Sequence, residues 1–178
     1  MLNIEPGLVH VYTGDGKGKT TAALGLALRV LGWGGRVCVV QFIKGYADIG
    51  EARFAANFGD RLVLRQFASD STRAIGEQDV PKRREEVRAA LEFAKQTIES
   101  GEYDLVILDE VNNALHYNLI DLADVIPLID HRPPGTELVL TGRNAPNAIV
   151  RKADYVTSMD AVKHPYQQNR PARKGIDY

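Results

Sequence analysis

The chain has 178 residues, a length that fits one domain. Its 22 Lys and Arg residues against 23 Asp and Glu residues leave a net charge of −1, which argues against a general nucleic-acid binder, because such proteins need a basic excess to neutralise phosphates. With 44% hydrophobic and 25% charged residues, the composition is typical of a soluble globular protein and excludes a wholly disordered chain.

Short apolar runs alternate with helix-length segments along the chain. The apolar runs predict strands at residues 8–12, 36–43, 62–67, 105–109, 137–141 and 155–159. The intervening segments predict helices at residues 19–31, 51–58, 81–100, 110–117, 121–130 and 145–153. Strand-helix alternation indicates parallel strands joined by right-handed crossovers, and hence a three-layer α/β domain with a mostly parallel sheet and helices on both faces.

The end of the sequence differs from the rest. Residues 164–178 are rich in polar side chains, contain two prolines and show no core pattern. We therefore expect a single domain over residues 1–163, followed by an extended C-terminal tail over residues 164–178.

A glycine-rich motif lies between the first predicted strand and the first predicted helix. It reads Thr13-Gly14-Asp15-Gly16-Lys17-Gly18-Lys19-Thr20-Thr21. This is the context of a P-loop, in which glycines let the backbone curl around an anion at a helix N-terminus. Lys19 is expected to reach the outer phosphates, and the Thr20 hydroxyl to ligate Mg²⁺. The domain is thus predicted to be P-loop NTPase-like (RecA-like), with residues 13–21 binding the nucleotide.

The motif departs from the usual P-loop pattern at one position. The pattern has Gly five residues before Gly18, where this chain has Thr13, so the motif is an altered Walker A sequence. For Lys17, contact with phosphate and exposure to solvent both remain open.

Two acids end the predicted strand at residues 105–109. Asp109 and Glu110 follow the apolar run Leu105-Val106-Ile107-Leu108. In P-loop proteins an Asp at a strand end holds Mg²⁺, and a following Glu ligates metal or orients a nucleophile. Because parallel strands deliver their carboxyl ends to one sheet edge, we expect both acids to meet the phosphate loop there. Which of the two touches the metal stays open.

The same edge should receive polar residues from other strands. Gln41 lies at the end of the second predicted strand, Lys44 lies just beyond it, and Arg143 follows the fifth. The planar fork of Arg143 suits phosphate oxygens, so we predict a phosphate clamp there. His10 is expected to be structural, and His116 and His164 show no metal-ligand spacing.

The single cysteine and the N-terminal sequence indicate the compartment. Cys38 lies in an apolar run, which predicts an inert core thiol and no disulfide or zinc pair. The first residues lack the basic start and apolar stretch of a signal peptide, and no apolar run is long enough for a membrane helix. We therefore expect a cytoplasmic protein without membrane contact.

Together these motifs resemble the corrinoid adenosyltransferases of the cob(I)yrinic acid a,c-diamide type. The resemblance rests on the glycine-lysine loop without its leading Gly and on four further blocks nearly end to end. These blocks are Val39-Val40-Gln41-Phe42-Ile43-Lys44-Gly45, Val106-Ile107-Leu108-Asp109-Glu110, Leu140-Thr141-Gly142-Arg143, and Val162-Lys163-His164-Pro165-Tyr166 with Lys174-Gly175-Ile176-Asp177-Tyr178.

The resemblance implies that Co(I) of a reduced corrinoid attacks the 5′ carbon of ATP and releases triphosphate. Such a nucleophile carries no proton, so the protein must align the reactants and stabilise the leaving group. Lys19, Glu110 and Arg143 would be the catalytic residues, with Mg²⁺ held through Thr20 and Asp109 or Glu110. Gln41 and Arg143 would join the phosphate loop in binding ATP.

The resemblance also implies a homodimer that holds the corrinoid in a water-poor pocket. The lone Cys38 offers no electron relay, so an external reductant such as a reduced flavoprotein is expected. Family members often carry a large aromatic residue in the loop after the third strand. Here Phe67 is the only aromatic residue in the segment 67–73, where we expect the corrinoid contacts.

Two other functions use a similar phosphate loop. A small-molecule P-loop kinase would need a lid of arginines, and the sequence shows no arginine-rich lid segment, although Asp109 or Glu110 could serve as its base. A nucleotide-dependent binding module of the RecA-like kind would need a basic, aromatic-rich stretch, which is also lacking.

Overall fold

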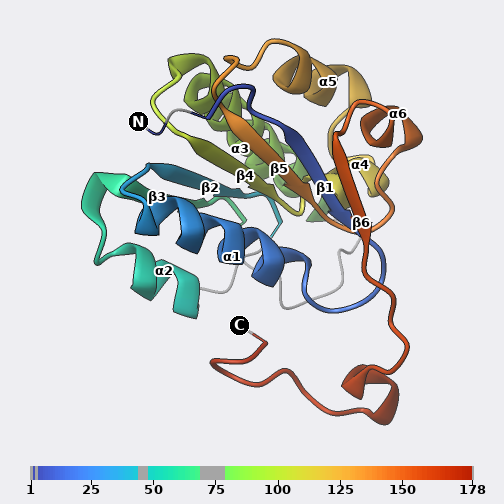
Figure 1. The fold of residues 1–178 in the computed structure, drawn as a ribbon. Coiled ribbons are helices and arrows are strands. Elements are labelled where there is room, and N and C mark those ends of the chain that lie inside the picture. Colours follow the sequence, from blue (N-terminus) through green and yellow to red (C-terminus); the bar gives the residue numbers. More distant parts are fainter. Residues whose placement is uncertain (1, 3, 44–47, 69–78, 178) are drawn as a thin grey trace.

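Six parallel strands form one sheet, as a computed structural model describing residues 2, 4–43, 48–68 and 79–177 shows (Figure 1). The strands are β1 (Val9–Thr13), β2 (Val37–Gln41), β3 (Leu62–Gln66), β4 (Leu105–Asp109), β5 (Glu137–Thr141) and β6 (Tyr155–Ser158). Their order across the sheet is β3-β2-β4-β5-β1-β6, and every neighbouring pair is parallel. The α/β fold class predicted from the sequence is therefore confirmed.

Helices cover both faces of this sheet (Figure 1). The helices are α1 (Lys19–Gly32), α2 (Gly50–Ala55), α3 (Val80–Ser100), α4 (Val111–His116), α5 (Leu122–Asp130) and α6 (Asn147–Val150), with the short 3₁₀ helices η1 (Gly59–Arg61) and η3 (Pro165–Gln168). One buried cluster joins the sheet to α1 and α2, and a second joins its other face to α3, α4 and α5. The fold therefore has three layers.

The sequence of β2 explains how one strand serves both layers. Val37 and Val39 pack toward α1, whereas Cys38 and Val40 pack toward α3, because successive side chains of a strand point to opposite faces. All five residues of β2 are buried. The continuous apolar run predicted such a strand, which is typical of a parallel sheet covered on both sides.

Capping residues place several helix ends close to the predicted limits. Asp121 begins α5 through a capping box with Asp124, and Gly101 ends α3 in the left-handed conformation. The predicted helix at 145–153 is wrong in extent, since α6 spans only Asn147–Val150. Pro146 has an extended ψ of 141°, and a residue before proline disfavours the helical region, so no helix begins earlier.

The strand order brings three chain segments to one edge of the sheet. β5 lies between β1 and β4, so the end of β4 is one strand away from the loop that follows β1. β2 lies on the other side of β4, with Gln41 in register with Asp109.

Among the residues that the structure describes, no helix has both the length and the apolar character needed to cross a bilayer.

The segment after β6 turns away from the sheet and passes below its carboxyl edge (Figure 1). Residues 164–177 are the described part of the predicted tail, and we call them the tail. It is not uniformly extended, because it contains η3 and a turn in which Asp177 donates its backbone N–H to Arg173 O. Nearly all of its side chains are exposed, so its position depends on polar contacts. The division between domain and tail remains a prediction.

Candidate active site

The loop between β1 and α1 has a curled backbone. Gly14 has a φ of 90° and Gly18, which precedes the first residue of α1, has a φ of 123°. Lys19 turns back over the loop, and its Nζ donates to Gly14 O at 2.7 Å and Gly16 O at 2.6 Å. The ammonium of Lys19 is thus centred on the loop, where a phosphate group would find it together with the N-terminus of α1.

The glycines of this loop are also required by the strand beside it. A Cβ atom on Gly14 would lie 2.5 Å from Met159 O, and one on Gly16 would lie 2.7 Å from the same oxygen. The Gly16 N–H donates to Met159 O at 2.6 Å. The loop therefore packs directly on the residue after β6, and this N–H is already bonded within the protein.

Thr13, which replaces the leading Gly of the usual motif, is the last residue of β1. Its hydroxyl accepts the backbone N–H of Ala145 at 3.2 Å, and its carbonyl accepts the N–H of Met159 at 2.9 Å. Thr13 therefore joins the phosphate loop to the segments that follow β5 and β6. A glycine at this position would lose the first of these hydrogen bonds.

Asp109 is fully buried at the end of β4 and accepts hydrogen bonds from three neighbours. Its Oδ1 accepts from the hydroxyls of Thr20 at 2.8 Å and Thr141 at 2.7 Å. Its Oδ2 accepts from Gln41 Nε2 at 3.1 Å. These neighbours belong to α1, β5 and β2, so the carboxylate holds together the end of the sheet and the start of the phosphate-loop helix.

Glu110 follows Asp109 in the left-handed conformation, with a φ of 64°. Its backbone N–H donates to the Thr141 hydroxyl at 2.9 Å, which fixes the turn from β4 into α4. A non-glycine residue in this region is uncommon and clusters at functional sites. This left-handed turn therefore lies at the position where the sequence predicts a functional acid.

Arg143 lies at the rim of the phosphate loop. Its Nε is 3.7 Å from Asp15 Oδ1, and about half of its side chain is exposed. Its backbone N–H donates to Asn113 Oδ1 at 2.6 Å. Burial, and after it the guanidinium of Arg143, lowers the pKa of Lys19. Two cations therefore approach the same loop, as expected of a site for a polyanion.

Across the described part of the chain, buried side-chain amide atoms of Gln41 and Asn112 lack hydrogen-bond partners at this edge, although Gln41 Nε2 is bonded to Asp109. Within the described residues, Gln41 Oε1 and both polar side-chain atoms of Asn112 have no hydrogen-bond partner, although both residues are fully buried. Leaving such atoms unsatisfied costs free energy. They lie on β2 and α4, beside the residues that surround Asp109.

Lys17 is bound neither to solvent alone nor to the phosphate loop, but to the end of the chain. Its Nζ donates to Ile176 O at 2.9 Å and pairs with Asp177 Oδ1 at 2.7 Å, both in the tail. The structure therefore shows Lys17 bound to the tail.

The structure thus brings the loop 13–21, Gln41, Asp109, Glu110 and Arg143 to one sheet edge. Lys44 lies outside the described residues, and so do residues 69–73 of the segment 67–73, where we expected corrinoid contacts. Phe67 packs on Phe93 of α3, with ring centroids 5.6 Å apart, and joins the core on that side.

Across the described ranges, no group of three or more His, Cys, Asp or Glu side chains is arranged to hold a metal by itself.

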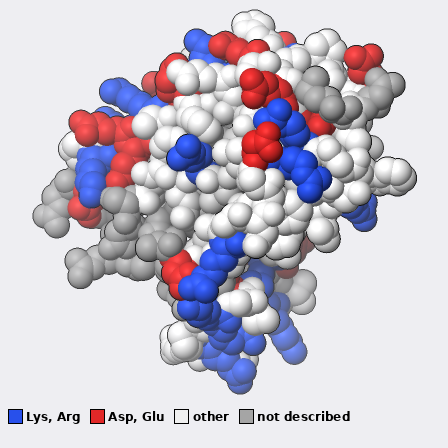
Figure 2. Space-filling view, turned by 90° about the vertical axis from the view of Figure 1, so that its left-hand side faces the viewer, with Lys and Arg blue, Asp and Glu red and all other residues white. Residues whose placement is uncertain are grey.

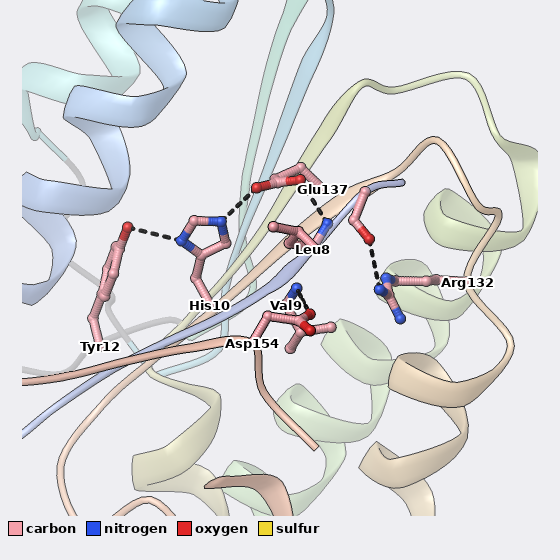
Figure 3. Close-up of polar contacts among 8 residues, drawn as sticks. Leu8, Val9, His10, Tyr12, Arg132, Glu137 and Asp154 are labelled. Atoms are coloured by element: carbon pink, nitrogen blue, oxygen red, sulfur yellow. Dashed lines mark hydrogen bonds and ion pairs between the residues drawn. The ribbon is translucent and has the colours of Figure 1, made fainter. Parts of the chain in front are cut away.

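A second polar cluster lies at the amino ends of β1 and β5, whereas the phosphate loop follows the carboxyl end of β1 (Figure 3). The His10 ring lies between Tyr12 and Glu137, with a hydrogen bond to each, and stacks on Tyr155 at 4.6 Å. Glu137 also accepts the backbone N–H of Leu8. These contacts occupy both ring nitrogens and tie β1 to β5, which fits the structural role expected for His10.

Sequence reasoning missed three contributors to the site. They are Asn113, which accepts from the backbone of Arg143, Met159, which contacts the phosphate loop, and Asp177, which pairs with Lys17. Only Asp177 lies in a block quoted for the family resemblance. Contacts such as these depend on the packing of distant segments and leave no local pattern.

Comparison with known proteins extends these observations. A family model described as "ATP:corrinoid adenosyltransferase BtuR/CobO/CobP" matches residues 5–178. Corrinoid adenosyltransferase from a Sinorhizobium species is 38% identical over 176 residues, which cover 98% of this chain and 81% of that protein. Proteins of the same name from Pseudomonas aeruginosa and Escherichia coli K12 are 36% and 35% identical over 174 residues, which cover 98% of this chain and 85% and 87% of theirs.

Solved structures share the fold. A KaiC-like protein from Pyrococcus horikoshii superposes with a TM-score of 0.53 at 15% identity, over 88% of this chain and 73% of that one. The flagellar accessory protein FlaH from Methanocaldococcus jannaschii gives a TM-score of 0.58 at 13% identity, over 86% of this chain and 71% of that one. At such low identity the likeness concerns the fold alone.

Proposed function

Because the chain belongs to the ATP:corrinoid adenosyltransferase family, we propose that it transfers the 5′-deoxyadenosyl group of ATP to Co(I) of a corrinoid and releases triphosphate. The electron pair of Co(I) forms the bond to the 5′ carbon. The bond from that carbon to oxygen breaks, and triphosphate leaves with its electron pair. Such a transfer serves the biosynthesis or salvage of adenosylcobalamin.

The charges at the sheet edge suit the departure of triphosphate. Lys19 lies over the phosphate loop, Arg143 lies at its rim, and the N-terminus of α1 adds a partial positive charge. These groups would stabilise the charge that develops on the leaving oxygen. No proton is removed from the nucleophile, so the reaction needs no general base.

The donor set at the end of β4 fits Mg²⁺ bound together with triphosphate. Thr20 and Asp109 supply oxygen atoms 2.8 Å apart, and Glu110 follows directly. Mg²⁺ prefers oxygen ligands and commonly uses one or two protein groups with phosphates and water. Thr20 with Asp109 or Glu110 would hold the ion, which would neutralise phosphate charge.

The proposal is carried by the Thr20–Asp109 hydrogen bond, which joins the phosphate loop to the strand-end acid. An anaerobic assay with ATP, Mg²⁺ and chemically reduced cobalamin tests it. Adenosylcobalamin and triphosphate should appear in equal amounts. Orthophosphate as the only released product would exclude this leaving group, and ADP formed only with an organic acceptor would indicate a kinase.

The remaining partners belong to this proposal as well. By family membership, the protein would act in the cytoplasm as a homodimer, with the corrinoid in a water-poor pocket. Cys38 is fully buried, so it offers no exposed thiol for electron transfer. We therefore expect an external reductant, such as a reduced flavoprotein, to generate Co(I).

A further inference from the structure

The phosphate loop and the tail are joined by one lysine. Lys17 Nζ contacts Ile176 O at 2.9 Å and Asp177 Oδ1 at 2.7 Å. About half of the Lys17 side chain remains exposed, against 22% for Asp177. Lys17 is therefore within reach of solvent while it is bound to the tail.

Asp177 has further partners within the tail. Its Oδ2 accepts from the backbone N–H of Arg173 at 2.9 Å and from Arg173 Nε at 3.2 Å. Lys17, and after it the Arg173 backbone, holds the pKa of Asp177 well below its usual range, so this carboxyl is ionised at neutral pH. If Lys17 left, Arg173 would still compensate the carboxylate.

A second ion pair attaches the tail elsewhere. Lys174 Nζ lies 3.0 Å from Asp48 Oδ2, and Asp48 also pairs with Arg53 of α2. Figure 2 shows basic side chains gathered at the bottom of the molecule, the level at which the tail lies in Figure 1. This pair lies outside the phosphate loop and provides a matched control for the first.

The Asp177 carboxylate and a triphosphate bound in the loop would compete for the same cation, the ammonium of Lys17. Exposed ion pairs contribute little free energy, whereas a triphosphate offers several charged oxygens to an ammonium in a phosphate loop. Asp177 also places a negative charge beside the polyanion. Both effects oppose nucleotide binding for as long as Asp177 remains on Lys17.

We propose that Asp177 sets the nucleotide affinity of the site by competing with triphosphate for Lys17, an inference that rests on the proposed function. The tail leaves Lys17 when ATP binds and returns when the product triphosphate departs. Asp177 is thus a positioning residue that acts through Lys17 and contacts neither reacting atom.

Calorimetric titration of the full chain with ATP and Mg²⁺ tests this competition. Asp177→Asn should lower the Kd for ATP about two- to fivefold, the range that loss of one exposed ion pair allows. Asp177→Glu should keep the wild-type affinity. In a Lys17→Met background, Asp177→Asn should change nothing further. Circular dichroism melts establish that each variant is folded.

Asp48→Asn is the control, since it breaks the other tail contact. Its Kd for ATP should equal that of the wild type. An equal or weaker affinity of Asp177→Asn would overturn the inference, and so would an equally large gain in Asp48→Asn. If the wild-type chain bound no ATP, the proposed function itself would fall.

Limited trypsin digestion provides a readout independent of affinity. Cleavage after Arg173 and Lys174 should accelerate when ATP and Mg²⁺ are added to the wild type, because Lys17 then releases the tail. In Asp177→Asn the cleavage should already be fast and insensitive to ATP. Protection of these sites by ATP would overturn the inference.

Discussion

The hydroxyl of Thr20 donates a hydrogen bond of 2.8 Å to Oδ1 of Asp109, which joins the first turn of α1 to the end of β4. Thr141 donates to the same oxygen from β5, the strand that lies between β4 and β1. Side chains from separate elements therefore meet on one carboxylate. These hydrogen bonds fix the position of the phosphate loop relative to Asp109 at the end of β4.

Lys19→Ala should lower kcat/KM for ATP at least about 100-fold, because it removes a cation that faces the leaving group. The free energy of unfolding should change by less than about 1 kcal/mol, since the lysine contacts only loop carbonyls. Steady-state kinetics and urea unfolding measure the two effects. Lys152→Ala, which removes an exposed ion pair with Asp130, should leave kcat/KM unchanged. An active Lys19→Ala enzyme would contradict the placement of triphosphate.

Glu110→Gln should raise the Mg²⁺ concentration needed for half-maximal activity, because it removes a negative charge beside Thr20 and Asp109. Gln has nearly the same shape, so the left-handed turn at this position is retained. A Mg²⁺ titration at fixed ATP measures the shift. Glu102→Gln, at an exposed position, should show the wild-type titration. An unchanged curve for Glu110→Gln would remove this residue from the metal site.

Gly16→Ala should destabilise the fold by about 1–3 kcal/mol and weaken ATP binding, because its Cβ would lie 2.7 Å from Met159 O. Gly25→Ala should instead stabilise it by about 0.5–1 kcal/mol, since this glycine lies inside α1 with no atom within 4 Å of a new Cβ. Urea unfolding and ATP titration of both variants test the contrast. Equal stabilities of the two variants would show that the loop can move away from β6.

Cys38 should resist thiol reagents in the folded protein at pH 8. Burial raises its pKa to about 12, which leaves almost no thiolate in the native state. In the unfolded chain the thiol ionises near its ordinary pKa, so the free energy of unfolding should fall as pH rises above about 9. Urea unfolding between pH 7 and 10.5 measures this slope. Cys38→Ala should reduce this dependence of the free energy of unfolding on pH. An equal slope in the variant and the wild type would show that other groups cause it.

Much of the fold could be predicted because parallel strands have a simple sequence signature. The predicted strands 105–109 and 137–141 have the same bounds as β4 and β5. The predicted helix at 145–153 began too early, because the residue before Pro146 disfavours the helical region, and it also ended three residues too late. Local patterns thus predicted the type and the ends of these two strands, but only the type of α6.

The meeting of the phosphate loop with Asp109 could also be predicted, since it follows from the rule that strand ends share one edge. The contact between Lys17 and Ile176 could not, because the two residues are 159 positions apart and no periodicity relates them. The same holds for Met159, which approaches the phosphate loop only through the pairing of β6 with β1.

Because β5 lies between β1 and β4, its buried residues influence the position of both neighbouring strands. β5 is hydrogen-bonded to β1 on one side and β4 on the other, and Val139 at its middle is fully buried. A shift of β5 would therefore displace both β1, which leads into the phosphate loop, and β4, which ends in Asp109. Evolutionary tuning of turnover can therefore proceed through residues that never meet a reactant.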